Sequence, residues 1–294
     1  MMGGSMVALV TPMHGDGSLD LEALARLVEF HAEAGTDAII VSGTTGESPC
    51  LSASELATLI RAALEAAAGR VTIIGGSGSN STARAIELTA VVREAGAAAA
   101  LVVTPYYNKP TQQGLFLHYE AVAREGGLPV ILYNVPGRTA CDLLPETVAR
   151  LADVPGVVAI KEAVPGTERL RRFRELMGDR LGLLSGDDAT AMDFLLAGGD
   201  GVISVTANVA PRLMHGLCEA ARHAEPRKAQ ALNDRLEGLH RTLFIEPNPI
   251  PVKWAVAQMG LIQSGIRLPL TQLEERHYNE VRAAMARAGV EYTS

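Results

Sequence analysis

Eight short apolar runs recur along most of this chain, and stretches of helical character separate them. The runs occupy residues 6–10, 38–41, 71–74, 99–103, 130–133, 157–161, 181–185 and 201–205. Helical periodicity marks intervening segments such as 21–34, 52–68, 82–95 and 189–197. Eight strand and helix units in about 225 residues match a (β/α)8 TIM barrel, an α/β fold. A doubly wound sheet usually has fewer strands and a glycine-rich G-x-G-x-x-G turn after the first, whereas the first run here leads into Thr11 and Pro12.

The pattern changes after about residue 225, where only helical segments remain. These segments cover residues 228–243, 251–259 and 271–288, and a proline-rich run at 246–251 interrupts them. We therefore predict two parts, a (β/α)8 barrel domain at residues 1–225 and a C-terminal helical domain at residues 226–294. Because TIM barrels place their chemistry at the carboxyl ends of their strands, we expect the functional residues in the first part.

Charge and composition exclude several classes of partner. A net charge of -7 and a pI near 5.6 leave no basic surface that could release counterions from a nucleic acid. The first ten residues lack a basic start followed by a long apolar stretch, and the alanine-rich run at 95–103 is too short to span a membrane. The cysteines Cys50, Cys141 and Cys218 are odd in number and far apart, which suits a reducing compartment. We expect a soluble cytoplasmic protein.

Lys161 is an unusual residue for its position, because it places an amine at the carboxyl end of a predicted buried strand. The chain has four lysines against 22 arginines, and only lysine readily loses its proton when desolvated and then attacks a carbonyl. A lysine there could also extend to solvent or pair with a carboxylate. Strand alternation places Val157 and Ala159 on the Lys161 face and Glu162 on the opposite one, so Glu162 is not its expected partner.

Further polar and aromatic residues gather at the ends of other predicted strands. The second strand leads into a Gly-Thr-Thr-Gly-Glu-Ser turn at residues 43–48, whose amides and hydroxyls suit a carboxylate. The fourth ends near Tyr106 and Tyr107, two phenols in a chain that is only 4% aromatic. The fifth ends at Tyr133 and is followed by Arg138, whose guanidinium fork can bind a carboxylate. An ordinary turn, core packing and a surface arginine are the plainer interpretations of these features.

No cofactor is expected from the sequence. The seven histidines are scattered without ligand spacing, so no metal site is predicted. There is no fingerprint for nicotinamide or flavin, and no phosphate cradle that would accompany Lys161 as a pyridoxal phosphate anchor. Asp187 and Asp188, after the seventh strand, fit helix capping better than catalysis.

Taken together, these motifs resemble the dihydrodipicolinate synthase (4-hydroxy-tetrahydrodipicolinate synthase) family of pyruvate-dependent class I aldolases. The resemblance covers essentially the whole chain in order. The Tyr-Asn-Val-Pro-Gly-Arg and Gly-Thr-Thr-Gly-Glu-Ser motifs together are more specific than either alone. The matching runs are residues 43–48, 104–107, 133–139, 160–162, 186–188 and 248–253.

The resemblance implies a lyase that condenses pyruvate with L-aspartate 4-semialdehyde, the first committed step of diaminopimelate and lysine biosynthesis. By this resemblance Lys161 forms the Schiff base with pyruvate, and Thr45 with the amides of its turn holds the pyruvate carboxylate. Tyr133 carries protons and is linked through Thr44 to Tyr107, which in this family comes from a neighbouring subunit.

The remaining roles concern the second substrate and the assembly. The resemblance assigns Arg138 to the carboxylate of L-aspartate 4-semialdehyde, and Gly186 and Ile203 to the pyruvate pocket through their backbone groups. It also implies a homotetramer built as a dimer of dimers.

Two other functions stay open. A sister lyase that splits N-acetylneuraminate or a 2-keto-3-deoxy sugar acid uses the same lysine and tyrosine. Such lyases generally have smaller or hydroxylated residues around the Arg138 position. A pyruvate-binding barrel without catalysis would be expected to have lost Lys161, Tyr133 or Thr44, and this chain retains all three.

Regulation is where the chain departs from one branch of the family. Members inhibited by lysine commonly line an interface pocket with histidines and a glutamate, at positions that correspond by motif spacing to Ala53, Leu56 and Arg84. Asn80 and Tyr106 are retained. An arginine in place of an acid reverses the charge that would hold the lysine ammonium, so we expect weak or absent lysine feedback.

Overall fold

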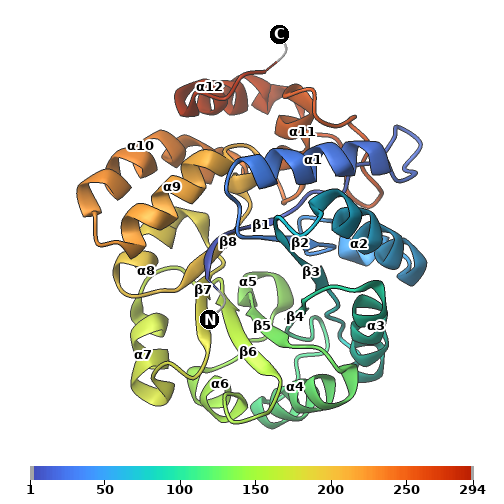
Figure 1. Cartoon of the computed structure of the whole chain (residues 1–294), viewed down its shortest axis with the longest axis vertical. Coiled ribbons are helices and arrows are strands. Elements are labelled where there is room, and N and C mark those ends of the chain that lie inside the picture. Colours follow the sequence, from blue (N-terminus) through green and yellow to red (C-terminus); the bar gives the residue numbers. More distant parts are fainter. Residues whose placement is uncertain (1–2, 293–294) are drawn as a thin grey trace.

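Eight parallel strands form a closed barrel in sequence order (Figure 1). The computed structural model describes residues 3–292. Strand β1 closes the ring because it pairs with both β2 and β8. The expected TIM barrel is confirmed, although β1 begins before its predicted run. The strands are β1 (Gly4–Ala8), β2 (Ala38–Val41), β3 (Thr72–Gly76), β4 (Ala99–Val103), β5 (Val130–Asn134), β6 (Val157–Glu162), β7 (Gly182–Ser185) and β8 (Gly201–Ser204).

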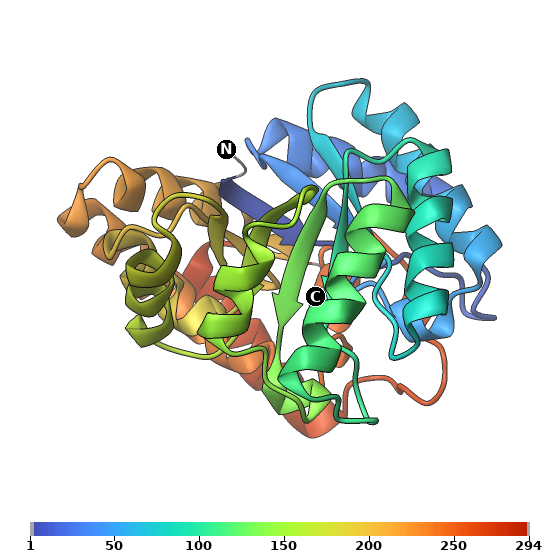
Figure 2. The same cartoon turned by 90° about the horizontal axis from the view of Figure 1, so that it is seen from below.

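An outer layer of helices surrounds the barrel, and Figure 2 shows the same layer from another side. The start of α2 illustrates why these segments are helical, since Ser52 and Glu55 form the reciprocal hydrogen bonds of a capping box. No helix within residues 3–292 is both long and apolar enough to cross a membrane. The surrounding helices are α1 (Leu21–Glu33), α2 (Ala53–Ala67), α3 (Thr82–Ala95), α4 (Gln112–Gly126), α6 (Pro145–Leu151), α7 (Glu168–Met177), α8 (Ala191–Leu196) and α9 (Pro211–Arg222).

The chain after β8 and α9 is helical, as expected. It forms α10 (Pro226–Thr242), α11 (Ile250–Gln258) and α12 (Tyr278–Ala288), with α11 and α12 lying outside α1 in Figure 1. The expected boundary at residue 225 falls between α9 and α10. Side chains of both parts share one hydrophobic cluster, in which Val28, Leu236 and Val281 are all fully buried.

The last predicted helix is too long at its start. Helix α12 begins at Tyr278 after a short 3-10 turn, not at residue 271. The Glu274 amide donates to the Glu246 carboxylate, and Leu273 is buried in the shared cluster. These tertiary contacts hold residues 271–274 outside the helix, although their composition is compatible with one.

The barrel interior is filled by a separate apolar cluster that leads to the site. Ala159, Tyr133 and Ile203 belong to it. The expectation that Val157 shares this inner face with Ala159 is wrong, because Val157 lies in an outer cluster. A register shift between β5 and β6 at Val130 explains the difference, since alternation along β6 is regular only beyond it.

Candidate active site

Lys161 lies at the carboxyl end of β6 and is buried, with 4% of its surface exposed. Its Cα pairs with those of Tyr133 on β5 and Leu184 on β7. The Lys161 Nζ atom is 4.4 Å from the centre of the Tyr133 ring. Adjacent parallel strands therefore bring an amine and a phenol together inside the barrel, at the end where TIM barrels carry out catalysis.

Glu162 points away from Lys161, on the outer face of the same strand. Its carboxylate accepts hydrogen bonds from the Asn134 side chain and from the Val164 amide. Arg169 Nη1 lies 3.6 Å from its Oε2 atom. Burial raises the pKa of Glu162 to about 7, and these hydrogen bonds and the Arg169 charge only partly oppose the rise. The Glu162 carboxylate is thus engaged in contacts on the outer side of β6 and does not contact Lys161.

The turn at residues 43–48 lies against the end of β3. A Cβ atom on Gly76 would stand 2.0 Å from the Ser42 carbonyl oxygen, so only glycine allows this approach. The Thr11 hydroxyl donates to the Gly46 carbonyl at 2.7 Å. Within residues 3–292, the amides of Thr44 and Thr45 have no hydrogen-bond partner. Two N–H donors are therefore left for a ligand.

Asn248, in the segment between α10 and α11, connects two of the predicted substrate-binding residues. Its Nδ2 atom donates to Thr45 Oγ1 at 3.0 Å. Its backbone carbonyl accepts from Arg138 Nη2 at 3.3 Å. Arg138 belongs to α5 (Pro136–Thr139), a short helix directly after β5. The C-terminal part of the chain therefore completes a site whose other residues come from the barrel.

A buried ion pair connects the same turn to α11. Lys253 Nζ on α11 lies 2.5 Å from Glu47 Oε1, and both side chains are almost fully buried. The other Glu47 oxygen accepts from the Arg267 amide at 3.0 Å. Burial lowers the pKa of Lys253, against the raising effect of the Glu47 carboxylate. Lys253 is thus engaged in a structural contact, which leaves Lys161 as the lysine of the barrel interior.

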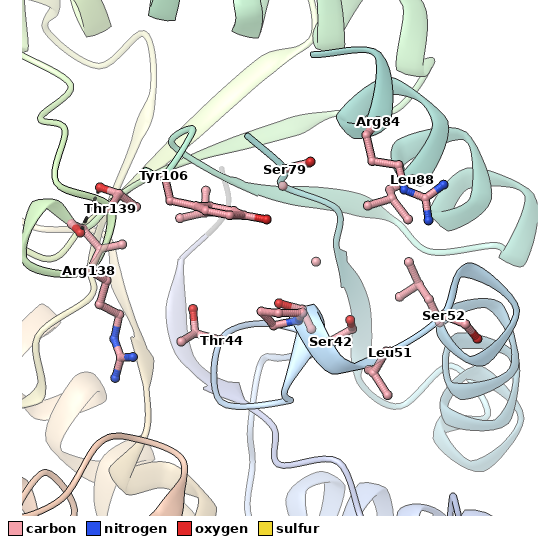
Figure 3. Close-up of a pocket in the computed structure, with 17 residues that line it drawn as sticks. Ser42, Thr44, Leu51, Ser52, Ser79, Arg84, Leu88, Tyr106, Arg138 and Thr139 are labelled. Carbon is pink, nitrogen blue, oxygen red and sulfur yellow. Dashed lines mark hydrogen bonds between the residues drawn. The ribbon is translucent and has the colours of Figure 1, made fainter. Parts of the chain in front are cut away.

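A cavity of about 370 Å³ opens beside Thr44. Figure 3 shows Arg138 and Arg84 at opposite sides of it, with Tyr106 extending across the space between them. Lys161 and Tyr133 are not part of its lining. The lining residues are Ser42, Thr44, Ser48, Pro49, Leu51, Ser52, Leu56, Gly76, Gly78, Ser79, Arg84, Leu88, Val103, Tyr106, Val135, Arg138 and Thr139.

Three other predicted site residues lie outside the lining of this cavity. Gly186 follows β7 next to Lys161, and its amide donates to the Glu162 carbonyl at 2.7 Å. Ile203 is buried on β8. Tyr107 is 86% exposed, and within the described part of the chain no hydrogen bond joins it to Thr44 or Tyr133. A single subunit therefore does not assemble the Tyr133, Thr44 and Tyr107 series.

The acidic residues after β7 have structural partners. The Asp187 carboxylate accepts from the Thr190 amide and hydroxyl, so the capping expected here is confirmed for Asp187. Asp188 accepts from the amides of Val205 and Thr206. Across residues 3–292, no group of three His, Cys, Asp or Glu side chains is arranged to hold a metal ion.

Two contacts of the site were not expected from the sequence. These are the Asn248 contact with Thr45 and the Glu47 contact with Lys253. Both join segments about 200 positions apart, at separations of 203 and 206. The available signals were the polar and proline-rich run at residues 246–251, between two helical segments, and the family motif at residues 248–253, which contains Asn248 and Lys253.

Comparison with known proteins agrees with this geometry. The model of the dihydrodipicolinate synthetase family matches residues 1–288. A 4-hydroxy-tetrahydrodipicolinate synthase of Methylococcus capsulatus is 60% identical over 290 residues, which are 99% of this chain and 100% of that protein. The crystal structure of the chloride-inhibited dihydrodipicolinate synthase from Acinetobacter baumannii, complexed with pyruvate, superposes with a TM-score of 0.97. It is 48% identical, with 99% of this chain and 100% of that chain covered.

A second solved structure gives the same result. Dihydrodipicolinate synthase from Aquifex aeolicus has a TM-score of 0.96 and 42% identity, with 100% of both chains covered. The resemblance expected from the motifs is thereby confirmed along the whole chain. A matching family model, full-length relatives and superposable structures lead to one conclusion: this chain belongs to the dihydrodipicolinate synthetase family.

Proposed function

We propose that this chain is a lyase that condenses pyruvate with L-aspartate 4-semialdehyde to give 4-hydroxy-tetrahydrodipicolinate. The observation that carries the proposal is the buried Lys161 amine, 4.4 Å from the Tyr133 ring centre at the carboxyl end of the barrel. Relatives that are 60% and 57% identical carry the name of this synthase. The reaction is the first committed step of diaminopimelate and lysine biosynthesis.

In the first half of the reaction, Lys161 Nζ adds to the carbonyl carbon of pyruvate. The carbonyl oxygen leaves as water, and a protonated imine joins the lysine to the substrate. This cation withdraws electrons, so the pyruvate methyl group loses a proton and becomes an enamine carbon. Tyr133, beside Lys161, is the proton carrier for these steps. Thr44 and Tyr107 of a second copy link Tyr133 to solvent.

The turn at residues 43–48 holds the pyruvate carboxylate. The Thr44 and Thr45 amides have no partner within the described chain, and Thr45 adds a hydroxyl. Several N–H and O–H donors directed at one anion stabilise it and fix its orientation. Gly186 and Ile203 border the same space through their backbone groups. The carbonyl carbon is thereby presented to Lys161.

In the second half, the enamine carbon attacks the aldehyde carbon of L-aspartate 4-semialdehyde. A carbon–carbon bond forms, and the aldehyde oxygen becomes a hydroxyl group. The amine of the same substrate then attacks the imine carbon and displaces Lys161, which closes the ring. Arg138 binds the carboxylate of this substrate, because its guanidinium fork presents paired donors at the cavity.

The proposed chemistry needs more than one copy of the chain. Tyr107 is 86% exposed in a single subunit, although it is a large aromatic residue. We infer that a second copy covers it and brings it to the neighbouring Thr44, within a homotetramer built from two such dimers. Analytical ultracentrifugation tests this directly, and a fully active monomer would contradict it.

The three free cysteines are compatible with a cytoplasmic location.

The decisive experiment compares two pairs of substrates. Initial rates are measured for pyruvate with L-aspartate 4-semialdehyde and for pyruvate with N-acetylmannosamine, using the wild type and Lys161→Arg. We expect turnover of the semialdehyde that is lost in the variant, because an arginine cannot form the imine. Turnover of N-acetylmannosamine alone would instead make the protein a sister lyase. No turnover of either would point to a pyruvate-binding barrel.

A further inference from the structure

Asn248 contacts a proposed pyruvate-binding residue but belongs to none of the motifs that contact substrate in the scheme above. It is 5% exposed, and its Nδ2 atom donates to Thr45 Oγ1 at 3.0 Å. Its Oδ1 atom is buried without a hydrogen-bond partner in the described structure. A buried polar atom without a partner destabilises a protein, so its presence calls for a reason beyond stability.

The direction of this hydrogen bond determines what the Thr45 hydroxyl can do. A hydroxyl group has one proton to donate and two lone pairs that accept. An amide nitrogen can only donate, so Asn248 occupies a lone pair of Thr45 Oγ1 and leaves the hydroxyl proton unused. A carboxylate can only accept. We propose that Asn248 is a positioning residue that keeps the Thr45 hydroxyl oriented as a donor to the substrate carboxylate.

The same residue serves the second substrate through a different group. Its backbone carbonyl accepts from Arg138 Nη2 at 3.3 Å, whereas only its side chain reaches Thr45. Substitution of the side chain removes the bond to Thr45 and retains the carbonyl. The proposal, which rests on the proposed function, therefore predicts a defect in the use of pyruvate with normal use of the aldehyde.

The test is a double-mutant cycle with Asn248→Ala and Thr45→Val. We expect Asn248→Ala to lower kcat/KM for pyruvate about tenfold, because the loss of one hydrogen bond has an effect of about this size. The value of kcat/KM for the aldehyde should stay within about twofold of that of the wild type. Because the effect passes through Thr45, the double variant should be no worse than Thr45→Val alone. Additive losses, or equal losses for both substrates, would overturn the proposal.

Asn248→Asp tests the direction of the hydrogen bond. A carboxylate can only accept, so the Thr45 hydroxyl would turn toward it and away from pyruvate. We expect kcat/KM for pyruvate to fall at least as far as in Asn248→Ala. If Asn248→Asp used pyruvate as well as the wild type, Thr45 would not act as a donor and the proposal would be wrong.

Asn208→Ala is the matched control. Asn208 is also buried, and its side chain makes hydrogen bonds to Val10, Ala8 and Val205, but it contacts no proposed substrate-binding residue. We expect a lower melting temperature with unchanged kcat/KM for pyruvate. If this variant reproduced the Asn248→Ala defect, general loosening of the fold would explain both.

Borohydride trapping separates the inference from the proposed function. The fraction of chain trapped as a pyruvate adduct is measured by mass spectrometry against pyruvate concentration, with no second substrate present. This titration compares pyruvate affinity between the wild type and Asn248→Ala whether or not the semialdehyde is turned over. Equal titration curves would refute the role of Asn248, even in an active synthase.

Discussion

Lys161 and Tyr133 are paired across β6 and β5, with the lysine amine 4.4 Å from the centre of the tyrosine ring. The pairing follows from strand register, because residues paired on adjacent parallel strands have their side chains on the same face of the sheet, which is here the inner face. The distance between the proposed imine lysine and its proton carrier is therefore built into the sheet. Substitutions that shift either strand should disturb catalysis before they disturb folding.

The first prediction concerns the space beside Lys161. A Cβ atom on Gly186 would lie 2.9 Å from Lys161 Cε and 3.1 Å from Lys161 Cγ. In Gly186→Ala the lysine side chain must move, and a displacement of about 1 Å can lower a rate about 100-fold. We expect a loss of this order in kcat/KM for pyruvate, measured in steady state and by borohydride trapping.

Gly15→Ala is the control for this substitution, because a Cβ atom there would meet nothing within 4 Å. It should retain wild-type kinetics. Gly186→Ala with normal trapping of pyruvate would show that Lys161 can adjust its position freely, contrary to the close contacts around it.

The second prediction concerns the buried pair of Glu47 and Lys253. Loss of one member of such a pair leaves an uncompensated buried charge, which typically costs about 3 to 5 kcal/mol. Lys253→Met should therefore lower the free energy of unfolding by this amount in denaturant titrations. Lys228→Met removes an exposed pair with Glu225, in which both side chains are about half exposed, and should cause no measurable change. Equal effects of the two variants would contradict the prediction.

The third prediction is a pH dependence from Glu162. Burial raises the pKa of this carboxyl from 4.5 to about 7. Between pH 4.5 and about pH 7, the folded protein therefore holds a proton on Glu162 that the unfolded chain has released. The stability that Glu162 contributes is complete below about pH 4.5 and is lost as the pH rises through 7. A shift of this size corresponds to about 3 kcal/mol at most.

Glu162→Gln provides the comparison. The measured quantity is the free energy of unfolding of the wild type minus that of the variant. This difference should decrease as the pH rises from 5 to 8. The same difference for Glu146→Gln should stay constant in this range, because backbone hydrogen bonding and a hydrogen bond from Arg172 lower the pKa of that exposed carboxyl. A flat profile for Glu162→Gln as well would show that its pKa is not raised.

The fourth prediction concerns feedback by lysine. Arg84 lines the cavity on the side opposite Arg138 and pairs with Glu87 at 3.0 Å (Figure 3). A guanidinium there repels the ammonium groups of lysine, and Leu56 on the same lining offers no polar contact. We expect the wild-type rate to be essentially unchanged at about 1 mM lysine, a concentration that half fills a site with a millimolar Kd.

Arg84→Glu should increase sensitivity to lysine, because it restores a carboxylate to the cavity. Arg61→Glu makes the same change of charge at an exposed position outside the cavity lining and should leave the response unaltered. Strong inhibition of the wild type by submillimolar lysine would refute the prediction.

Much of the fold and part of the site could be predicted from the sequence, for physical reasons. Parallel strands covered on both faces appear as apolar runs, so eight of them could be counted. Lys161 was conspicuous because a charge at the end of such a run is rare. The place of Val157 could not be predicted, since the register shift between β5 and β6 leaves no trace in the apolar pattern.

The missed contacts depend on how distant segments meet. Asn248 reaches Thr45 only because α11 returns to the barrel, and local patterns carry no information about such a return. Residues 271–274 have a composition compatible with helix, but the contact of Glu274 with Glu246 decides their conformation. Local sequence patterns therefore predict the barrel better than they predict the contacts of the C-terminal segments with it.

The separation between the turn at residues 43–48 and its partners has a consequence for how the protein is made. Glu47 leaves the ribosome early, but Asn248, Lys253 and Arg267 follow about 200 residues later. At about 5 to 20 residues per second, this is a delay of about 10 to 40 s. By the end of this interval all eight strands have been synthesised, since β8 ends at Ser204, but until then the turn lacks the contacts that hold it in place. A nascent chain in which all eight strands have been made therefore still lacks the contacts that fix this part of the proposed site.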